Sequence, residues 1–349
     1  MASLSDVARA AGVSATTASF VLNGRTSEMR ISPKTAGKVL EAARELGYIP
    51  NIAAKKLNSS SVRDSMLPDI ALLWSPSMHP SFLGSFVKSA RYYFELGKVS
   101  EMSINIAPFS EERFSSRSSD YLSSRYNGAL FSPMRDPEVS AIGRFVEDLP
   151  FVMMHVESEY FPNVIIDNAG VGRTAAEIFY RRGHRSVMIV YRSTLGETLI
   201  EDLRVAGFRE KCAERGLNCT ACEIPQSALG TIELRSEFGR TLAEKMLEKK
   251  FRQTAFFIQD DVVMTGFMTR ICQGGVRIPE DIEMITYGNN DLAGILCPTV
   301  TTIDYPVDKL TLEALQMLSR RMRDPHAAPE KTVVQCDVTF RESCPKIQL

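Results

Sequence analysis

The chain has 349 residues, of which 44% are apolar and 24% charged, and its formal net charge is −1. Since a single hydrophobic core seldom grows past roughly 250–300 residues, this length argues against a one-domain protein. No apolar run reaches the roughly 18 residues of a membrane helix, so no membrane partner is expected. Seven cysteines, an odd number in a long chain, argue against a disulfide framework and favour a reducing cytosol.

Charge is distributed unevenly along the chain. Residues 1–62 carry eight lysines and arginines against four acidic residues, a net +4, whereas the remainder has 33 basic and 38 acidic residues, a net −5. A small basic segment on an acidic body is typical of a polyanion-binding module on a neutral carrier, although an excess of this size also arises by chance. The charge therefore directs attention to the N-terminal segment without deciding its function.

Two short helices are predicted at the start of the chain. A capping box at Ser3-x-x-Asp6 opens the first helix, and Gly12 ends it because glycine tolerates the left-handed conformation at a helix C-terminus. Ser14 can then cap a second helix from Ala15 to Leu22. Two short helices joined by such a tight turn indicate a helix-turn-helix, whose second helix lies in the major groove of DNA.

A third helix is predicted to complete this N-terminal unit. Ser32 is a suitable N-cap, Pro33 suits the first helical position, and Gly47 marks the end. The residues expected to face inward from this helix are Val39, Leu40, Ala43 and Leu46.

The second helix is the candidate reader of DNA sequence. Its predicted inward residues, together with the turn before it, are Val13, Ala18, Val21 and Leu22. The outward residues suited to base edges are Ala15, Thr16 and Phe20, because an apolar group can touch a thymine methyl and a hydroxyl can hydrogen-bond a base. The residues suited to phosphate contacts are Ser14, Thr17, Ser19 and Asn23. In the alternative reading, Phe20 packs under the third helix.

A block of motifs in this segment matches a known family. The matching residues are Asp6-Val7-Ala8, Ala11-Gly12-Val13-Ser14, Thr17, Ser19, Asn23 and Gly47-Tyr48-x-Pro50-Asn51. On these residues the chain resembles the lactose/purine repressor (LacI/GalR-type) family of bacterial transcription regulators. The resemblance implies a sequence-specific DNA-binding regulator, most simply a repressor, that binds a double-stranded DNA operator.

The segment after the third helix also takes its meaning from this resemblance. Residues 51–57 are short and basic and end in a leucine, and the polar tract 58–61 follows. The resemblance implies a hinge helix that folds only on DNA, with Leu57 wedged into a minor-groove step and Asn51, Ala54 and Lys55 beside it. An ordinary interdomain linker with a chance leucine is the alternative.

The body of the chain alternates short apolar strands with amphipathic helices. The predicted strands are 70–74, 128–131, 151–154, 164–166, 187–190, 255–258 and 284–286, and the predicted helices are 82–96, 170–181, 203–215, 242–248 and 262–272. This alternation favours parallel, doubly wound sheets, and the strands are too many for one compact sheet. We therefore expect an all-α helix-turn-helix domain (1–48), a hinge helix and linker (49–67), and a two-lobed α/β core (68–349).

The resemblance extends through the core and implies a periplasmic-binding-protein-like fold with an effector between two lobes. Its markers are Asn127-Gly128, Asp167-Asn168, Gly183-His184-Arg185, Arg204-x-x-Gly207-Phe208, Asp261 with Gly266, Ile278-Pro279-Glu280-Asp281-Ile282, Pro298 with Thr301-Thr302, and Arg341-x-Ser343. The lobes are expected at about 68–163 plus 290–320 and at about 164–289 plus 321–345.

The effector site is carried over from the resemblance by position. Phe82 would be an aromatic platform, Arg204 a charged clamp, and Asp167 and Asp260 polar contacts. Two departures put the ligand in doubt: Gly288 stands where relatives have an aspartate, and Asp260 replaces an asparagine. The expected effector is a sugar, a sugar phosphate or a related polar metabolite, phosphorylated or acidic if Arg204 holds it. A surface salt bridge is the alternative role for this arginine.

Other chemical signals in the sequence are weak. Gly170-x-Gly172-x-x-Ala175 imitates a dinucleotide fingerprint, but the acidic residue expected about 20 positions later is missing, so helix packing explains it better. Cys219-x-x-Cys222, with Cys212 nearby, has no histidine close by, and a structural zinc needs four ligands. We expect no metal, no cofactor and no enzymatic activity, with redox sensing as a minor option for these cysteines.

Several expectations concern the whole protein. The first residues lack the apolar core of a secretory leader, so a cytoplasmic, nucleoid-associated protein is expected. Two recognition helices related by a twofold axis would read a near-palindromic operator, and without a heptad tail after Arg341 we expect a homodimer. The alternatives are a cytosolic nucleotide- or sugar-binding enzyme on the same core, and a regulator without effector control.

Overall fold

The computed structural model describes residues 4–22, 26, 29, 31–46, 67–74, 80–108, 122–123, 125–132, 149–192, 200–248, 253–288, 291–324 and 327–346. The chain divides into an N-terminal unit, Met1–Leu67 with Asp120–Tyr126, and a core, Pro68–Ser119 with Asn127–Leu349. Over the described residues, no helix has the length and apolar character needed to span a membrane.

The N-terminal unit contains three helices that contact one another: α1 (Leu4–Ala11), α2 (Ala15–Leu22) and α3 (Pro33–Glu45). Gly12 ends α1 with φ +66°, the left-handed conformation that favours glycine. The Ser14 Oγ accepts the Thr17 N–H at 3.0 Å. Likewise the Ser32 Oγ accepts the Thr35 N–H at 3.2 Å. The predicted N-caps of α2 and α3 are therefore confirmed.

A small apolar core holds these helices together. Its buried members are Val7, Ala8, Ala11, Ala18, Val21, Val39, Ala42 and Ala43. The expectation that Leu40 and Leu46 face inward is wrong, because these side chains are 52% and 41% exposed. Successive residues of a helix differ by about 100° in direction, so Leu40 cannot share the narrow face of Val39, Ala42 and Ala43. Leu46 lies beyond the end of α3.

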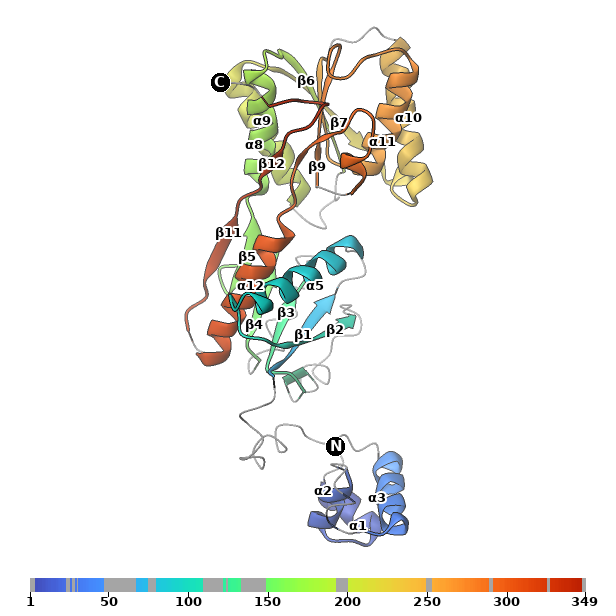
Figure 1. Ribbon diagram of the computed structural model, residues 1–349, viewed down its shortest axis with the longest axis vertical. Helices are drawn as coiled ribbons and strands as arrows, with labels where there is room; N and C mark the ends of the chain where they lie inside the picture. The colour runs from blue at the N-terminus through green and yellow to red at the C-terminus, as the bar shows by residue number, and fades with distance from the viewer. Residues whose placement is uncertain are drawn as a thin grey trace. The chain divides into compact units, whose positions relative to one another are not determined.

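The first lobe of the core, called the N-lobe, contains a parallel sheet with the strand order β11-β5-β4-β3-β1-β2 (Figure 1). Its strands are β1 (Asp69–Trp74), β2 (Ser103–Pro108), β3 (Gly128–Phe131), β4 (Phe151–Met154), β5 (Asn163–Ile166) and β11 (Lys331–Val334). Its helices include α5 (Pro80–Glu95) and α12 (Val307–Arg323), which contact each other. Strands β3 to β5 are buried throughout, as expected for a parallel sheet covered on both faces.

The second lobe, called the C-lobe, has the strand order β12-β10-β9-β8-β6-β7, parallel except for the pairing of β12 with β10. Its strands are β6 (Ser186–Arg192), β7 (Asn218–Ile224), β8 (Ala255–Ile258), β9 (Glu283–Tyr287), β10 (Thr301–Ile303) and β12 (Val338–Thr339). Its helices pack as two pairs: α8 (Asn168–Arg181) with α9 (Ile200–Arg215), and α10 (Ile232–Glu248) with α11 (Asp261–Gln273). The two-lobed α/β architecture with parallel sheets is confirmed.

The expected assignment of segments to the lobes was wrong in three places. Strand β5 and strand β11 pair with each other in the N-lobe sheet, although both were placed in the C-lobe. Strand β10 pairs with β9 in the C-lobe sheet, although it was placed in the N-lobe. These strands have only three or four residues, and their partners are distant in the sequence, so no local pattern specifies the sheet that they join.

Glycines allow the C-lobe helices to approach closely. A Cβ on Gly172 of α8 would lie 2.0 Å from the Arg204 carbonyl oxygen of α9, and one on Gly207 would lie 2.1 Å from the Ala169 carbonyl oxygen. Ala175, one turn after Gly172, is fully buried. Helix packing thus accounts for the dinucleotide-like glycine pattern, as predicted. The same contact fixes the backbone of α9 at Arg204.

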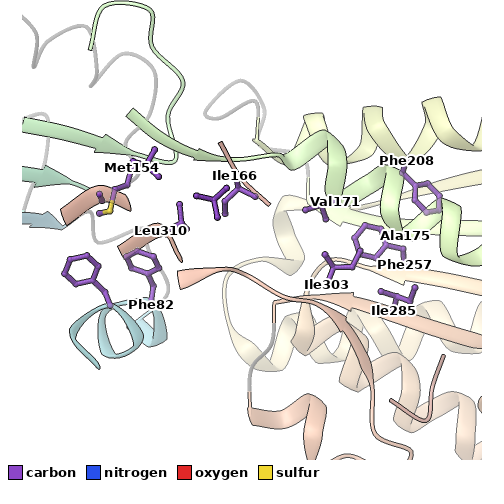
Figure 2. Packing of buried hydrophobic residues seen from close by; sticks show 14 of the residues in the cluster. Phe82, Met154, Ile166, Val171, Ala175, Phe208, Phe257, Ile285, Ile303 and Leu310 are labelled. Atoms are coloured by element: carbon purple, nitrogen blue, oxygen red, sulfur yellow. The ribbon is translucent and has the colours of Figure 1, made fainter. Parts of the chain in front are cut away.

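One apolar cluster runs from the N-lobe into the C-lobe through the connecting segments. Figure 2 shows Phe82 and Met154 at one end, Ile166 and Leu310 between, and Phe208 and Phe257 at the other. The chain passes between the lobes at residues 167, 304–306 and 335–337, next to this cluster. The carboxyl ends of strands from both sheets therefore face the region between the lobes.

Candidate DNA-binding surface and effector site

The surface of α2 is exposed where the DNA-contacting residues were predicted. Ser14, Ala15 and Thr16 are exposed, while Thr17, Ser19 and Phe20 are half-buried. Ala18 and Val21 are buried, so the opposite face of the helix is occupied by the small core. Half-burial of Phe20 leaves part of its ring accessible.

Basic side chains lie on the neighbouring helices of this unit. Lys34 and Lys38 on α3 are exposed, and Arg9 on α1 is 3.3 Å from the Asp6 carboxylate. Such side chains suit phosphate contacts. The other predicted DNA-contacting residues lie outside the described residues; they are Asn23, Asn51, Ala54, Lys55 and Leu57.

In the core, five aromatic rings form a chain of contacts between the lobes, which we call the interlobe cluster. Its members are Trp74, Phe82, His155, Tyr305 and Tyr287. Phe82 stacks on Trp74 with 5.7 Å between the ring centroids, and it meets His155 edge-on with a centroid distance of 5.4 Å. Tyr305 then stacks on His155 at 5.5 Å and meets Tyr287 edge-on at 5.9 Å. The predicted platform Phe82 is therefore 5% exposed and packed inside this cluster.

His155 occupies a special position at the end of β4. It is the one described non-glycine residue with a positive φ, 70°. Burial and the nearby positive charge of Arg204 lower the pKa of His155 from 6.5 to about 3, so the ring is neutral. The Tyr305 hydroxyl lies 2.9 Å from the His155 ring nitrogen, and burial raises the pKa of Tyr305 well above its ordinary value. These two groups form a neutral hydrogen-bonded pair.

Arg204 on α9 adjoins the C-lobe end of the interlobe cluster. Its side chain is buried, and the guanidinium carbon lies 4.2 Å from the centroid of the Tyr287 ring. Its Nε donates to the Asn168 Oδ1 at 3.0 Å, and its Nη1 donates to the Gln259 Oε1 at 3.2 Å. The predicted clamp is thus held rigidly between two amides and an aromatic face. A surface salt bridge, the alternative role, is excluded by this burial.

Gln259 follows β8 directly and has one unused donor. Its backbone N–H donates to the Val190 carbonyl at 2.9 Å, which fixes the residue against β6. Its Oε1 accepts from Arg204, while its buried Nε2 has no acceptor among the residues that the structure describes. Ser132 follows β3 directly, and its buried Oγ likewise has no hydrogen-bond partner within the described part of the chain.

The two predicted aspartates cap helices. Asp167 caps α8 by accepting the Gly170 N–H at 2.7 Å, and its carboxylate lies 3.3 Å from the Arg173 guanidinium. Asp260 caps α11 by accepting the N–H groups of Val262 and Val263, each at 3.0 Å. Its other oxygen lies 3.1 Å from the Arg235 guanidinium. Both carboxylates are therefore already neutralised by partners inside the protein.

Sequence reasoning missed several residues that the fold brings together here. They are Trp74, His155, Asn168, Gln259, Tyr287 and Tyr305. Most end a strand or follow one directly, and this position was the available signal, because ligands of open α/β folds bind beyond the carboxyl ends of strands. At the departure noted in the sequence, Gly288 has φ +91°, a conformation unfavourable for the aspartate of relatives.

The Cys219-x-x-Cys222 motif lies on strand β7, where residues three apart point to opposite faces. Cys219 packs against the apolar cluster that contains Cys212, whereas Cys222 packs against a second cluster on the other face of the sheet. The two thiols therefore cannot chelate one ion. Across the described residues, no group of three or more histidine, cysteine, aspartate or glutamate side chains is arranged to hold a metal.

Comparisons with known proteins agree on one family. The model for bacterial regulatory proteins of the lacI family matches residues 3–51, and the model for the periplasmic binding protein-like domain matches residues 176–344. The HTH-type transcriptional regulator DegA of Bacillus subtilis is 27% identical over 97% of this chain and 96% of its own length. The HTH-type transcriptional repressor PurR of Vibrio parahaemolyticus is 27% identical over 99% of this chain and 100% of its own length.

Solved structures show the same fold. The Lac repressor dimer bound to operator and the anti-inducer ONPF aligns with a TM-score of 0.66 at 22% identity, over 99% of each chain. The lacI-family model and the two relatives describe transcription regulators and not enzymes. Together with the N-terminal helices and the two-lobed core, they place residues 3–51 in the lacI family of bacterial regulatory proteins and residues 176–344 in a periplasmic binding protein-like domain.

Proposed function

We propose that this regulator represses transcription as a homodimer that binds a near-palindromic operator and responds to a small polar effector. The observation that carries the proposal is the surface of α2. Small and hydroxyl-bearing side chains are exposed there, on a helix fixed by capping and by a buried core, and exposed lysines lie on the next helix. An enzyme has no use for such a surface.

The proposed DNA contacts divide into two kinds. Ala15, Thr16 and Phe20 would contact base edges in the major groove, where methyl groups and hydrogen-bonding atoms differ between base pairs. Ser14, Thr17, Ser19 and Asn23 would contact phosphates and so fix the position of the helix without reading sequence. Lys34 and Lys38 would add to the salt dependence of binding.

The segment after α3 would add a minor-groove contact. In this proposal Leu57 enters a central base step and kinks the duplex, with Asn51, Ala54 and Lys55 against the backbone. Insertion of an apolar side chain unstacks bases, and the wider protein–DNA contact offsets that cost. The operator would therefore have a conserved central step between its two half-sites.

Exposed apolar side chains on the core are consistent with a dimer. On the N-lobe, Val87 and Tyr92 of α5, Leu96 directly after α5, and Ile106 of β2 are each 46–56% exposed. On the C-lobe, Ile232 of α10 is 62% exposed and Ile295 is 76% exposed. We propose that a second copy of this chain covers some of these side chains. The Lac repressor structure to which the chain is similar is a dimer.

The proposed effector is a sugar, a sugar phosphate or a related polar metabolite, bound between the lobes. Arg204 would contact it directly, and Phe82 would support it through the interlobe cluster. Asp167 and Asp260 would border the site as helix caps, because their carboxylates already accept from backbone N–H groups. Binding would shift the lobes and thereby alter operator affinity, provided that the effector prefers one arrangement. We place this action in the cytoplasm, at the nucleoid.

Selection from a random pool of DNA duplexes with the full-length protein at moderate salt tests the proposal. We expect recovery of a near-palindrome with a conserved central step. Phe20→Ala should relax the half-site sequence, whereas Lys34→Ala should weaken binding to all sequences alike and reduce its salt dependence. Failure to enrich any sequence, with or without candidate effectors, would contradict the assignment.

A further inference from the structure

Arg204 carries a positive charge that the fold buries. The residue is 7% exposed, and the partners of its guanidinium are the neutral amides of Asn168 and Gln259 and the ring of Tyr287. Within the described part of the chain, no carboxylate forms a salt bridge with it. A buried charge is costly unless it is paired, so this arrangement favours an anion from outside the fold.

The nearby carboxylates do not fill this role. Asp167 is paired with Arg173, and Asp260 is paired with Arg235. Both also accept backbone N–H groups at the start of a helix, which holds them in place. Arg204 therefore differs from Arg173 and Arg235, each of which has an acidic partner.

The orientation of Gln259 provides a second donor beside this charge. A guanidinium has donors and no acceptor, so the amide of Gln259 must turn its oxygen toward Arg204. Its Nε2 consequently points elsewhere, buried and without an acceptor among the described residues. A neutral donor and a cation thus lie next to each other, and the donor is available for an acceptor that the fold does not supply.

We propose that Gln259 is a specificity-determining residue and that, with Arg204, it selects an effector bearing a carboxylate. This inference rests on the proposed function, because it refines the ligand of the same regulator. One carboxylate neutralises the single charge of Arg204 and offers a second oxygen to the Gln259 Nε2. A phosphate dianion would bring one negative charge more than Arg204 can neutralise. Since both groups are buried between the lobes, binding of the acid is coupled to lobe movement.

The test compares acids with uncharged compounds of the same shape. Thermal unfolding of the full-length protein is measured with acetate against acetamide, benzoate against benzamide, and glucuronate against glucuronamide, at constant ionic strength. At ten times its Kd, a carboxylate should raise the Tm by roughly 2–3 °C, and its amide should not. Inorganic phosphate serves as a separate arm. Equal shifts from acid and amide, a larger shift from phosphate, or no shift from any acid would overturn the proposal.

The substitution Gln259→Glu supplies a carboxylate beside Arg204 and so tests, in the ligand-free protein, whether this arginine lacks a counter-ion. The substituted carboxylate would lie beside Arg204, so the ligand-free Tm should rise, by about 2–4 °C. Affinity for the acids should fall roughly tenfold to 100-fold, because the donor is lost and a like charge is added. Gln273→Glu, the same change at an exposed position of α11, is the matched control. An unchanged acid response in Gln259→Glu, or a lower ligand-free Tm, would contradict the inference.

DNA binding separates this inference from the proposed function. Arg204→Met should abolish the response to acids. Cooperative unfolding of this variant, and its binding to the selected operator, would show that the variant is folded. If the wild-type protein binds its operator but responds to neutral compounds only, the carboxylate assignment is wrong and the regulator remains. If neither operator nor ligand binds, the proposed function itself is wrong.

Discussion

Two arginines of the C-lobe, the half-buried Arg182 and the buried Arg204, lie at opposite ends of strand β9 and differ in their partners. At the start of the strand, Arg182 pairs with both oxygens of Glu283 and donates to the Pro345 carbonyl at 2.6 Å. At the end of the strand, Arg204 lies over the ring of Tyr287, and its acceptors among the described residues are neutral amides. The first charge is neutralised within the fold, which is typical of a structural role. The second charge is left for a ligand.

The Glu283 cluster joins three segments that are distant in the sequence. The His184 Nε2 lies 3.0 Å from the carboxylate, and the Cys344 thiol donates to it at 3.3 Å. Burial alone would raise the pKa of Glu283, but hydrogen bonds from His184, Arg182 and Cys344 outweigh burial and lower the pKa from 4.5 to about 2. The cluster therefore fastens the C-terminal segment and the end of α8 to the base of the C-lobe sheet.

The largest expected effect comes from removing the carboxylate that neutralises Arg182. Glu283→Gln should lower the free energy of unfolding by about 3 kcal/mol, because it removes a buried carboxylate and leaves the half-buried Arg182 guanidinium without its counter-ion. Urea denaturation followed by circular dichroism measures this change. Glu330→Gln removes the carboxylate from the exposed ion pair with Arg320 and should leave the midpoint nearly unchanged. A similar decrease in the free energy of unfolding in both variants would show that the buried ion pair of Arg182 with Glu283 stabilises the fold no more than an exposed ion pair does.

Acid should weaken the Glu283 cluster in a defined pH window. Because the folded-state pKa of Glu283 lies below its ordinary value, its contribution is fully present above pH 4.5 and is lost as the pH falls toward 2. That contribution is about 3 kcal/mol. The stability of the wild type should therefore fall across this window more steeply than that of Glu283→Gln, measured by urea denaturation at each pH. Parallel curves would remove Glu283 from the account.

A smaller effect is expected from moving Arg204 without changing it. Gly172→Ala places a Cβ against the Arg204 carbonyl oxygen and must force α8 and α9 apart, at a cost of about 1–3 kcal/mol. Acid binding should weaken as well, since the guanidinium shifts relative to Gln259. Gly84→Ala is the control, because nothing lies within 4 Å of a Cβ there and alanine favours the helix. Unchanged stability and acid binding in Gly172→Ala would show that the helix contact does not position Arg204.

No effect is expected on the DNA sequence that is read. Gln259 lies in the core, as do Arg182 and Arg204, and not in the N-terminal unit. The Gln259→Glu variant should therefore select the same operator from a random pool as the wild type. Thr16→Ala, a change on the exposed surface of α2, should alter the recovered half-site. A new operator for Gln259→Glu would mean that the core contributes to base recognition.

Local signals predicted much of this fold. Ser14, Gly12 and Ser32 defined the N-terminal helices because caps and turns depend on residues adjacent in the chain. The lobe assignment of β5, β10 and β11 failed because pairing partners such as Lys331 and Asn163 are far apart in the sequence. Strand β7 was missed because its partly exposed, mixed residues lack a clear alternation.

The candidate site was only partly predictable for the same reason. Arg204 was identified from its motif, but its lack of an acidic partner depends on where Asp167 and Asp260 find theirs. Gln259 appeared unremarkable in the sequence, since its role follows from the direction of a single amide group. Such relations arise only after folding brings separate strand ends together.

The comparison of the two arginines is tested most directly by ligand-free thermal unfolding of two substitutions that move a carboxylate in opposite directions. Glu283→Gln removes the acid beside Arg182, and Gln259→Glu adds one beside Arg204. The account predicts a lower Tm for the first variant and a higher Tm for the second, relative to the wild type. A lower Tm in both variants would show that Arg204 does not need a counter-ion, and would contradict the account.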